Sequence, residues 1–141
     1  MPPSNLLEAG YAAALGRAVF CFASLEWTAV RCCERLQPGC MDDLSERTAG
    51  RIADTLIHLI KRLPASAEHK ALHEAARDFE ALVGTRNNLV HAKPGRTAEG
   101  TEALFRHGDQ WLLEELERVA DRFTDCSRKL DQALAALLAG R

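Results

Sequence analysis

Apolar residues recur along most of the chain at alternating steps of three and four positions, which is the spacing of helices packed along one another. The first run predicts a helix from about Leu6 to Leu36, and Pro38-Gly39 ends it. The positions that this pattern turns toward a core are Tyr11, Leu15, Ala18, Phe22, Leu25, Ala29, Cys32 and Leu36.

The same rhythm predicts two further helices before residue 94. The second starts at Asp43, because Glu46 three residues later completes a capping box, and it ends at Pro64. The third has Ser66 as its N-cap and stops at Lys93-Pro94-Gly95. Their core-facing positions are Leu44, Thr48, Ile52, Leu56, Leu59 and Leu63, and then Leu72, Ala75, Phe79, Leu82, Arg86 and Leu89 or Val90.

Residues 94–110 lack a helical pattern. Two short segments on either side of His107-Gly108-Asp109 fit a hairpin, and the alternative is an irregular loop in which Asp109 caps the next helix. That last helix is predicted from about Leu112 to the C-terminus. The sequence therefore predicts an all-α fold, an antiparallel four-helix bundle that forms a single domain over residues 1–141.

Composition and charge narrow the class of protein. The chain is 47% hydrophobic and 27% charged, as in ordinary globular domains. It contains no run of about 18 consecutive apolar residues and no basic-then-apolar start, so we expect a cytoplasmic protein that does not enter a membrane. The net charge of −2 argues against nucleic-acid binding through a broadly basic surface, but it leaves room for a local basic site.

The cysteines and histidines do not follow a metal-binding pattern. The five cysteines include no pair spaced two to four residues apart, so we expect small apolar side chains in a reducing compartment. His69 and His73 lie one helical turn apart, but no third ligand is evident. The sequence therefore predicts no metal and no cofactor.

Two charged residues fall on apolar rows of the predicted helices. Glu26 belongs to a second row of the first helix, and Arg86 follows Phe79 by two turns on the third. A buried Arg needs an anion, which is either a carboxylate or a ligand phosphate. In one interpretation Glu26 pairs with Arg86 inside the bundle, and in the other Glu26 lies at the border of the row and reaches water. The second row contains Leu15, Val19, Phe22, Glu26, Val30 and Cys33.

Arg86 also begins the only segment with a specific pattern, Arg86-Asn87-x-x-x-His91. The segment resembles the motif of the HEPN superfamily, small all-helical bundles that carry R-x(4–6)-H late in the chain, often starting R-N. Composition alone predicts the strict R-N-x-x-x-H form about 0.01 times in this chain. On an ideal helix Arg86 and His91 point about 140° apart, so they meet through the length of Arg, a loosened last turn or a second subunit.

The resemblance implies a metal-independent endoribonuclease of toxin or defence type, acting as a homodimer whose two motifs line one cleft. His91 would be the general base that activates an RNA 2′-hydroxyl, leaving a 2′,3′-cyclic phosphate, while Arg86 binds the phosphate and Asn87 orients the histidine. DNA would be inert because it lacks that hydroxyl. The alternative is a non-catalytic relative that binds RNA or a protein such as an antitoxin.

Basic residues after the third predicted helix would complete an RNA-binding site. Lys93, Arg96 and Arg106 lie within or next to the irregular segment, and we expect them to border the cleft. Glu26 is the candidate for holding Arg86 in position.

Overall fold

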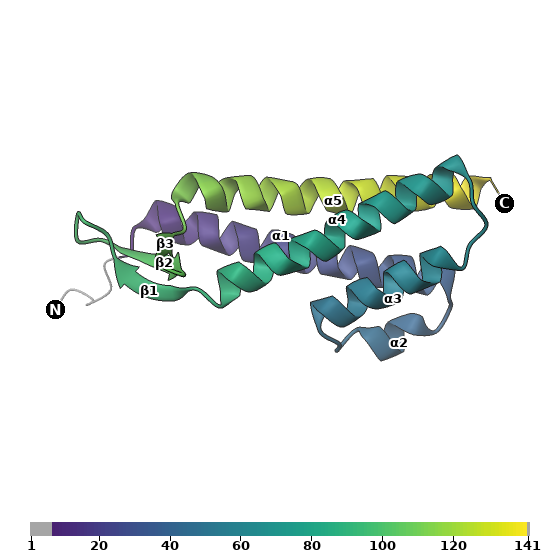
Figure 1. Ribbon diagram of the computed structural model, residues 1–141, viewed down its shortest axis with the longest axis horizontal. Coiled ribbons are helices and arrows are strands. Elements are labelled where there is room, and N and C mark those ends of the chain that lie inside the picture. Colours follow the sequence, from purple (N-terminus) through teal and green to yellow (C-terminus); the bar gives the residue numbers. More distant parts are fainter. Residues whose placement is uncertain (1–6, 141) are drawn as a thin grey trace.

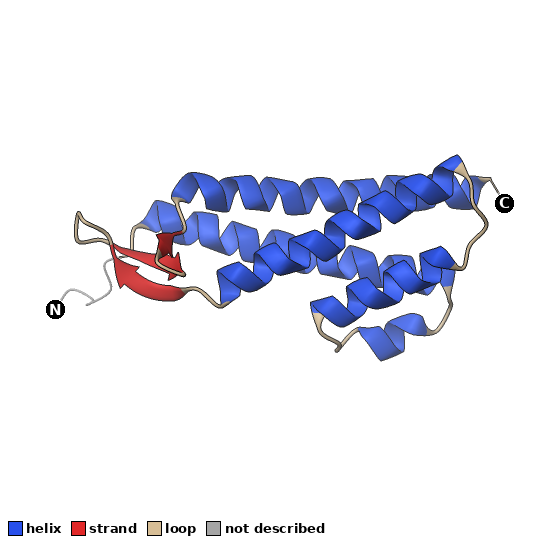
Figure 2. Ribbon diagram, viewed as in Figure 1, coloured by secondary structure: helices blue, strands red, loops and turns tan. Residues whose placement is uncertain are grey.

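The computed structural model describes residues 7–140, and these form a helical body with a small sheet at one end (Figures 1 and 2). The predominantly helical fold that the sequence predicts is confirmed. Leu6, the predicted start of the first helix, lies outside the described residues. The helices are α1 (Ala9–Leu36), α2 (Cys40–Leu44), α3 (Ala49–Lys61), α4 (Ala67–Val90) and α5 (Leu113–Ala139).

The long helices do not alternate in direction as we predicted. α1 and α5 lie side by side and run the same way, since Arg17 contacts Asp121 near their starts and Thr28 contacts Ser127 further along (Figure 1). α4 runs against both of them. The reason is that the short α2 already turns the chain back after α1, so α3 begins in the direction of α1.

The prediction that one helix starts at Asp43 is wrong, because the chain forms two helices there. Thr48 caps α3 by accepting a hydrogen bond from the Arg51 amide at 3.3 Å. Upstream, the Glu34 carboxylate accepts a hydrogen bond from the Gly39 amide at 2.9 Å and fixes the turn into α2. Glu34 lies outside the capping box of Asp43 and Glu46, so that pattern could not predict its role in this turn.

The predicted start of α4 is confirmed, whereas one of the two alternatives for α5 fails. Ser66 accepts a hydrogen bond from the His69 amide at 3.0 Å and is the N-cap of α4. Asp109 does not cap α5, because it lies in a strand and Leu112 is the N-cap residue.

The predicted hairpin is present between β2 (Glu102–Arg106) and β3 (Asp109–Gln110). His107 and Gly108 form its turn, with φ of 53° and 84°. Two positive φ values are typical of the type I′ turns that match the twist of paired strands.

A third strand, β1 (Lys93–Arg96), pairs with β2 although the sequence indicated only a helix stop there. Pro94 is compatible with this place because β1 is an edge strand of the sheet. Gly95 is required by close packing, since a Cβ atom there would lie 2.8 Å from the ring of Phe105.

Most predicted core positions are buried, and aromatic rings occupy the centre. The Phe22 ring meets the Phe123 ring edge-on at 5.0 Å between centroids and stacks on Phe79 at 6.3 Å. Val19 and Thr48 are exceptions, because both are exposed, and of the alternatives Leu89 and Val90 it is Leu89 that is buried. The second row of α1 is therefore only partly directed inward.

Tyr11 joins the sheet to the helices. Its side chain is 8% exposed, its hydroxyl donates to the Trp111 carbonyl at 2.7 Å, and the same oxygen accepts from the Leu104 amide at 3.1 Å. One hydroxyl thus satisfies two backbone groups, one at the end of β3 and one in β2.

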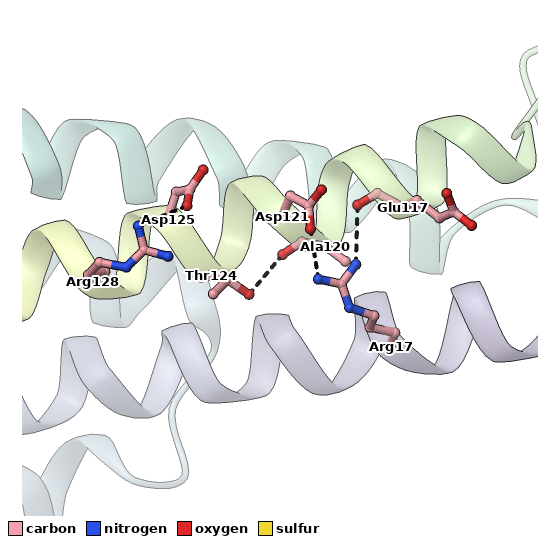
Figure 3. A network of polar contacts seen from close by, with 7 residues as sticks. All are labelled: Arg17, Glu117, Ala120, Asp121, Thr124, Asp125 and Arg128. Carbon is pink, nitrogen blue, oxygen red and sulfur yellow. Dashed lines mark hydrogen bonds and ion pairs between the residues drawn. The ribbon is translucent and has the colours of Figure 1, made fainter.

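Replacing Tyr11 with phenylalanine should lower the free energy of unfolding by about 1–3 kcal/mol, because both backbone groups lose their partner. Chemical denaturation measures the change. Thr124→Ala is the control, since the exposed Thr124 hydroxyl donates only to the Ala120 carbonyl of its own helix (Figure 3). Equal stability of Tyr11→Phe and wild type would contradict this role.

Candidate functional site

The C-terminal end of α4 positions the motif residues. Arg86 and Asn87 lie in the last turn and a half of the helix, and His91 is its C-cap. The His91 amide donates to the Asn87 carbonyl at 3.0 Å, and the φ and ψ of His91, −93° and 0°, have left the helical region. The helix ends here because Pro94 restricts Lys93 to an extended conformation, which starts β1.

Arg86 lies half-buried against α1. Its guanidinium carbon stands 4.8 Å from the centroid of the Phe22 ring, a cation–π contact. Its Nε atom is buried and has no hydrogen-bond partner. The Arg86 side chain is therefore held by packing, while its Nε–H group donates no hydrogen bond.

Glu26 lies near Arg86 without forming the pair that one interpretation expected. The pKa of the half-buried Glu26 carboxyl is raised because burial disfavours its charge, and the positive charge of Arg86 offsets part of this effect. Among the described residues, no ion pair includes either of them. Glu26 therefore influences Arg86 through its charge and does not clamp it.

The raised pKa of Glu26 gives a pH-dependent prediction. Because the folded protein holds this proton more tightly than the unfolded chain, Glu26 contributes most to stability below its unfolded pKa, and that contribution is lost as the pH rises. Glu26→Gln should therefore gain stability relative to wild type between about pH 4 and about pH 7. Thermal unfolding across this range measures the difference.

Glu34→Gln is the matched control with the opposite sign. Hydrogen bonds from the amides of Gly39 and Met41 lower the pKa of Glu34, so its contribution to stability is present at neutral pH and is lost on acidification. This variant should lose stability relative to wild type over the same rise in pH. If both variants respond in the same direction, the account of Glu26 is wrong.

Arg86 and His91 are not joined within one copy of the chain. Arg86 is half-buried toward α1, whereas His91 is exposed at the helix end, and no hydrogen bond of the described residues connects them. Their separation of five residues on a regular helix accounts for this divergence. Asn87 lies half-buried next to Arg86.

The three candidate RNA-binding residues all lie on the sheet, but on different faces. Lys93 is paired with Phe105, while Arg96 is paired with Glu102. Because side chains alternate along a strand, Arg96 and Arg106 share one face and Lys93 points to the other. The expected basic cluster is therefore divided by the sheet.

Arg106 lines an open pocket of about 260 Å³ beside the end of α4. Its Nε atom is buried and lacks a hydrogen-bond partner, as in Arg86. The sequence indicated only Arg106 among the residues that line this pocket, and Asn88, which directly follows Asn87 of the motif, was a second available signal. Its lining residues are Asn88, Arg106, His107, Asp109, Gln110, Trp111 and Glu115.

Three of the cysteines and His69 are used in packing. Burial raises the pKa of the Cys32, Cys33 and Cys126 thiols to about 12, so these thiols are protonated at neutral pH. The His69 ring makes a 2.8 Å hydrogen bond with the Ile60 carbonyl. In residues 7–140 no group of three or more His, Cys, Asp or Glu side chains is placed to hold a metal.

The chain was compared with models of protein families, with curated proteins and with solved structures. None of them matches. The resemblance to the HEPN superfamily therefore rests on the motif Arg86-Asn87-x-x-x-His91 and on its place at the end of a long helix.

Proposed function

We propose that this protein is a metal-independent endoribonuclease of the HEPN type, a toxin or defence enzyme acting in the cytoplasm as a homodimer. The observation that carries the proposal is the state of Arg86. It occupies the first position of the strict motif, forms no ion pair with a described residue, and has a buried Nε atom without a partner. A guanidinium that faces an aromatic ring and a half-buried carboxyl but forms no ion pair is suited to a ligand phosphate.

In this proposal His91 is the general base. Its exposed position at the end of α4 gives an RNA chain access to the imidazole, which takes the proton of a 2′-hydroxyl. The resulting oxygen attacks the adjacent phosphorus, and the bond to the 5′-oxygen of the next nucleotide breaks as that oxygen takes up a proton from water. The products are a 2′,3′-cyclic phosphate and a 5′-hydroxyl end.

Arg86 and Asn87 serve the same step from the last turns of α4. Arg86 stabilises the charge that develops on the phosphate oxygens, and Asn87 orients the imidazole. Glu26 is a positioning residue, since its charge acts on Arg86 across the edge of α1. No metal or cofactor takes part in this scheme.

The divergence of Arg86 and His91 makes a second copy part of the proposal. In a homodimer with a two-fold axis, Arg86 of one copy can face His91 of the other, so that the two motifs line one cleft as the resemblance implies. Arg96 and Arg106, on a common face of the sheet, are the basic residues best placed to bind the RNA backbone together.

One observation favours a second candidate function, a non-catalytic bundle that binds RNA or a protein partner such as an antitoxin. Within one copy Arg86 is half-buried against α1 while His91 is exposed, as expected for positions about 140° apart on an ideal helix. If no dimer brings them together, the motif serves binding alone.

Cleavage of matched RNA and DNA strands tests the proposal. With excess EDTA present, the protein should cut an RNA oligonucleotide and leave the DNA of the same sequence intact, because only RNA has the attacking hydroxyl. Cleavage of both strands would contradict the mechanism. Binding of RNA without cleavage would support the second function.

A further inference from the structure

The pocket of about 260 Å³ beside the end of α4, here called the hairpin pocket, is lined mainly by polar side chains. Asn88 of α4, Arg106 and Asp109 of the β2–β3 hairpin and Glu115 in the first turn of α5 belong to its lining. Within residues 7–140 none of these four side chains forms an ion pair or a hydrogen bond. Their donors and acceptors are therefore available to a ligand.

Trp111 gives the hairpin pocket an aromatic surface in a fixed place. Its half-buried side chain lines the pocket and also packs against the core. Its backbone is held on both sides, since its amide donates to the Leu104 carbonyl at 2.8 Å and its carbonyl accepts from the Tyr11 hydroxyl at 2.7 Å. The indole is thus positioned before a ligand binds, which lowers the entropy lost on binding.

The charges around the hairpin pocket restrict the class of ligand. One guanidinium, that of Arg106, lies among the two carboxylates of Asp109 and Glu115, so a free phosphate would be repelled. A cation would meet Arg106, and an apolar ligand would cover these charges without satisfying them. A flat uncharged ring with hydrogen-bond donors and acceptors avoids all three penalties and can stack on Trp111.

We propose that the hairpin pocket binds a guanine base. The O6 and N7 atoms of guanine accept hydrogen bonds from Arg106, which is the commonest specific contact between an arginine and a base. On the adjoining edge, N1–H and the 2-amino group donate to the carboxylate of Glu115, while the ring stacks on Trp111. Adenine fits less well, because its 6-amino group would place a donor opposite Arg106.

The hairpin pocket lies on the side of α4 that carries His91. Asn88 precedes His91 by three residues, and side chains at this spacing are neighbours on a helix. Resting on the proposed function, the guanine site would place an adjoining ribose of RNA next to the imidazole and determine which bond is cleaved. Arg106 has more N–H groups than the base uses, so it can also contact the RNA backbone.

Fluorescence of Trp111 measures ligand binding without any cleavage step. In Trp27→Phe, which replaces the exposed second tryptophan, Trp111 is the only reporter. GMP should quench its emission saturably and bind about tenfold more tightly than AMP. IMP lacks the 2-amino group, so it should bind several-fold more weakly than GMP. Ribose 5-phosphate should not quench, because it has no base to stack.

Glu115→Gln tests the carboxylate. This variant should lower the affinity for GMP about tenfold and leave the affinity for AMP nearly unchanged, because an amide replaces one acceptor with a donor. Glu114→Gln is the matched control, since it makes the same change of charge one residue earlier, on an exposed side chain that does not line the pocket. Circular dichroism verifies the fold, and if Glu115→Gln unfolds, the order GMP, IMP, AMP still tests the site.

An RNA oligonucleotide with a single guanine among uridines distinguishes RNA from a free nucleotide as the source of the base. It should bind more tightly than GMP, because the residues around His91 add contacts, and cleavage should occur next to its guanine. Tighter binding of GMP than of this RNA would overturn the link to RNA.

The outcomes for the guanine site and for the ribonuclease are separable. Absence of quenching by GMP, or equal quenching by GMP, AMP and ribose 5-phosphate, would overturn the guanine site, while cleavage of RNA at every base would leave the ribonuclease standing. Selective binding of GMP without cleavage of any RNA would support the guanine site and contradict the catalytic proposal.

Discussion

Replacing His91 with alanine is expected to reduce the rate of RNA cleavage by about 10²–10⁴-fold, the usual contribution of a general base. The variant keeps Arg86 and Asn87, so it should still bind RNA. Single-turnover cleavage of a labelled oligonucleotide measures the rate, and a binding assay under the same conditions measures the affinity.

The stability of the same variant separates catalysis from structure. His91 is exposed at the end of α4, so its removal should change the free energy of unfolding by no more than about 0.5 kcal/mol. His58→Ala is the control, because His58 is an exposed histidine on α3. Equal loss of cleavage in both variants would contradict the role of His91 as the general base.

Arg86→Met is expected to lower cleavage by about 10²–10³-fold, since it removes the charge that stabilises the phosphate in the transition state. A methionine keeps an unbranched side chain over the Phe22 ring, where S–aromatic contacts are favourable. Because Arg86 forms no ion pair with a described residue, the free energy of unfolding should change by no more than about 1 kcal/mol.

A structural role for Arg86 predicts the reverse. Removing one partner of a buried ion pair costs about 3–5 kcal/mol, and a loss of that size with cleavage retained would contradict the proposal. Arg77→Met is the matched control on the same helix, where an exposed Arg pairs with Glu80 at 3.0 Å. This change should affect neither cleavage nor stability appreciably.

The long helices could be predicted because each has a regular apolar period and clear ends. Ser66 provides a local N-cap for α4, and Pro94 provides a local stop. The boundary between α2 and α3 could not be predicted in this way, since Asp43 and Thr48 are both suitable caps. Hydrogen bonds from the turn after α1 to Glu34 help to set this boundary.

The three-stranded sheet could not be predicted completely from local sequence patterns. The hairpin turn was visible in His107-Gly108, but β1 depends on pairing with β2 and on packing of Phe105 over Gly95. Tyr11, almost a hundred residues away along the chain, binds backbone groups of this sheet. The sequence of residues 93–96 alone does not reveal these long-range contacts.

The sequence could select the residues of the candidate site but could not predict their geometry. The apolar period correctly placed Arg86 toward α1, and it indicated Glu26 as a neighbour. It could not tell that Arg86 stacks on Phe22 without forming an ion pair, because this depends on how α4 crosses α1. The inward position predicted for Val19 is wrong for the same reason, since no helix within residues 7–140 covers that side of α1.

Analysis of the ends left by wild type and His91→Ala acting on RNA in excess EDTA tests the general-base mechanism most directly. We expect wild type to leave 2′,3′-cyclic phosphate and 5′-hydroxyl ends and the variant to leave almost none. Ends with a free 3′-hydroxyl, or the same products from both proteins, would contradict it.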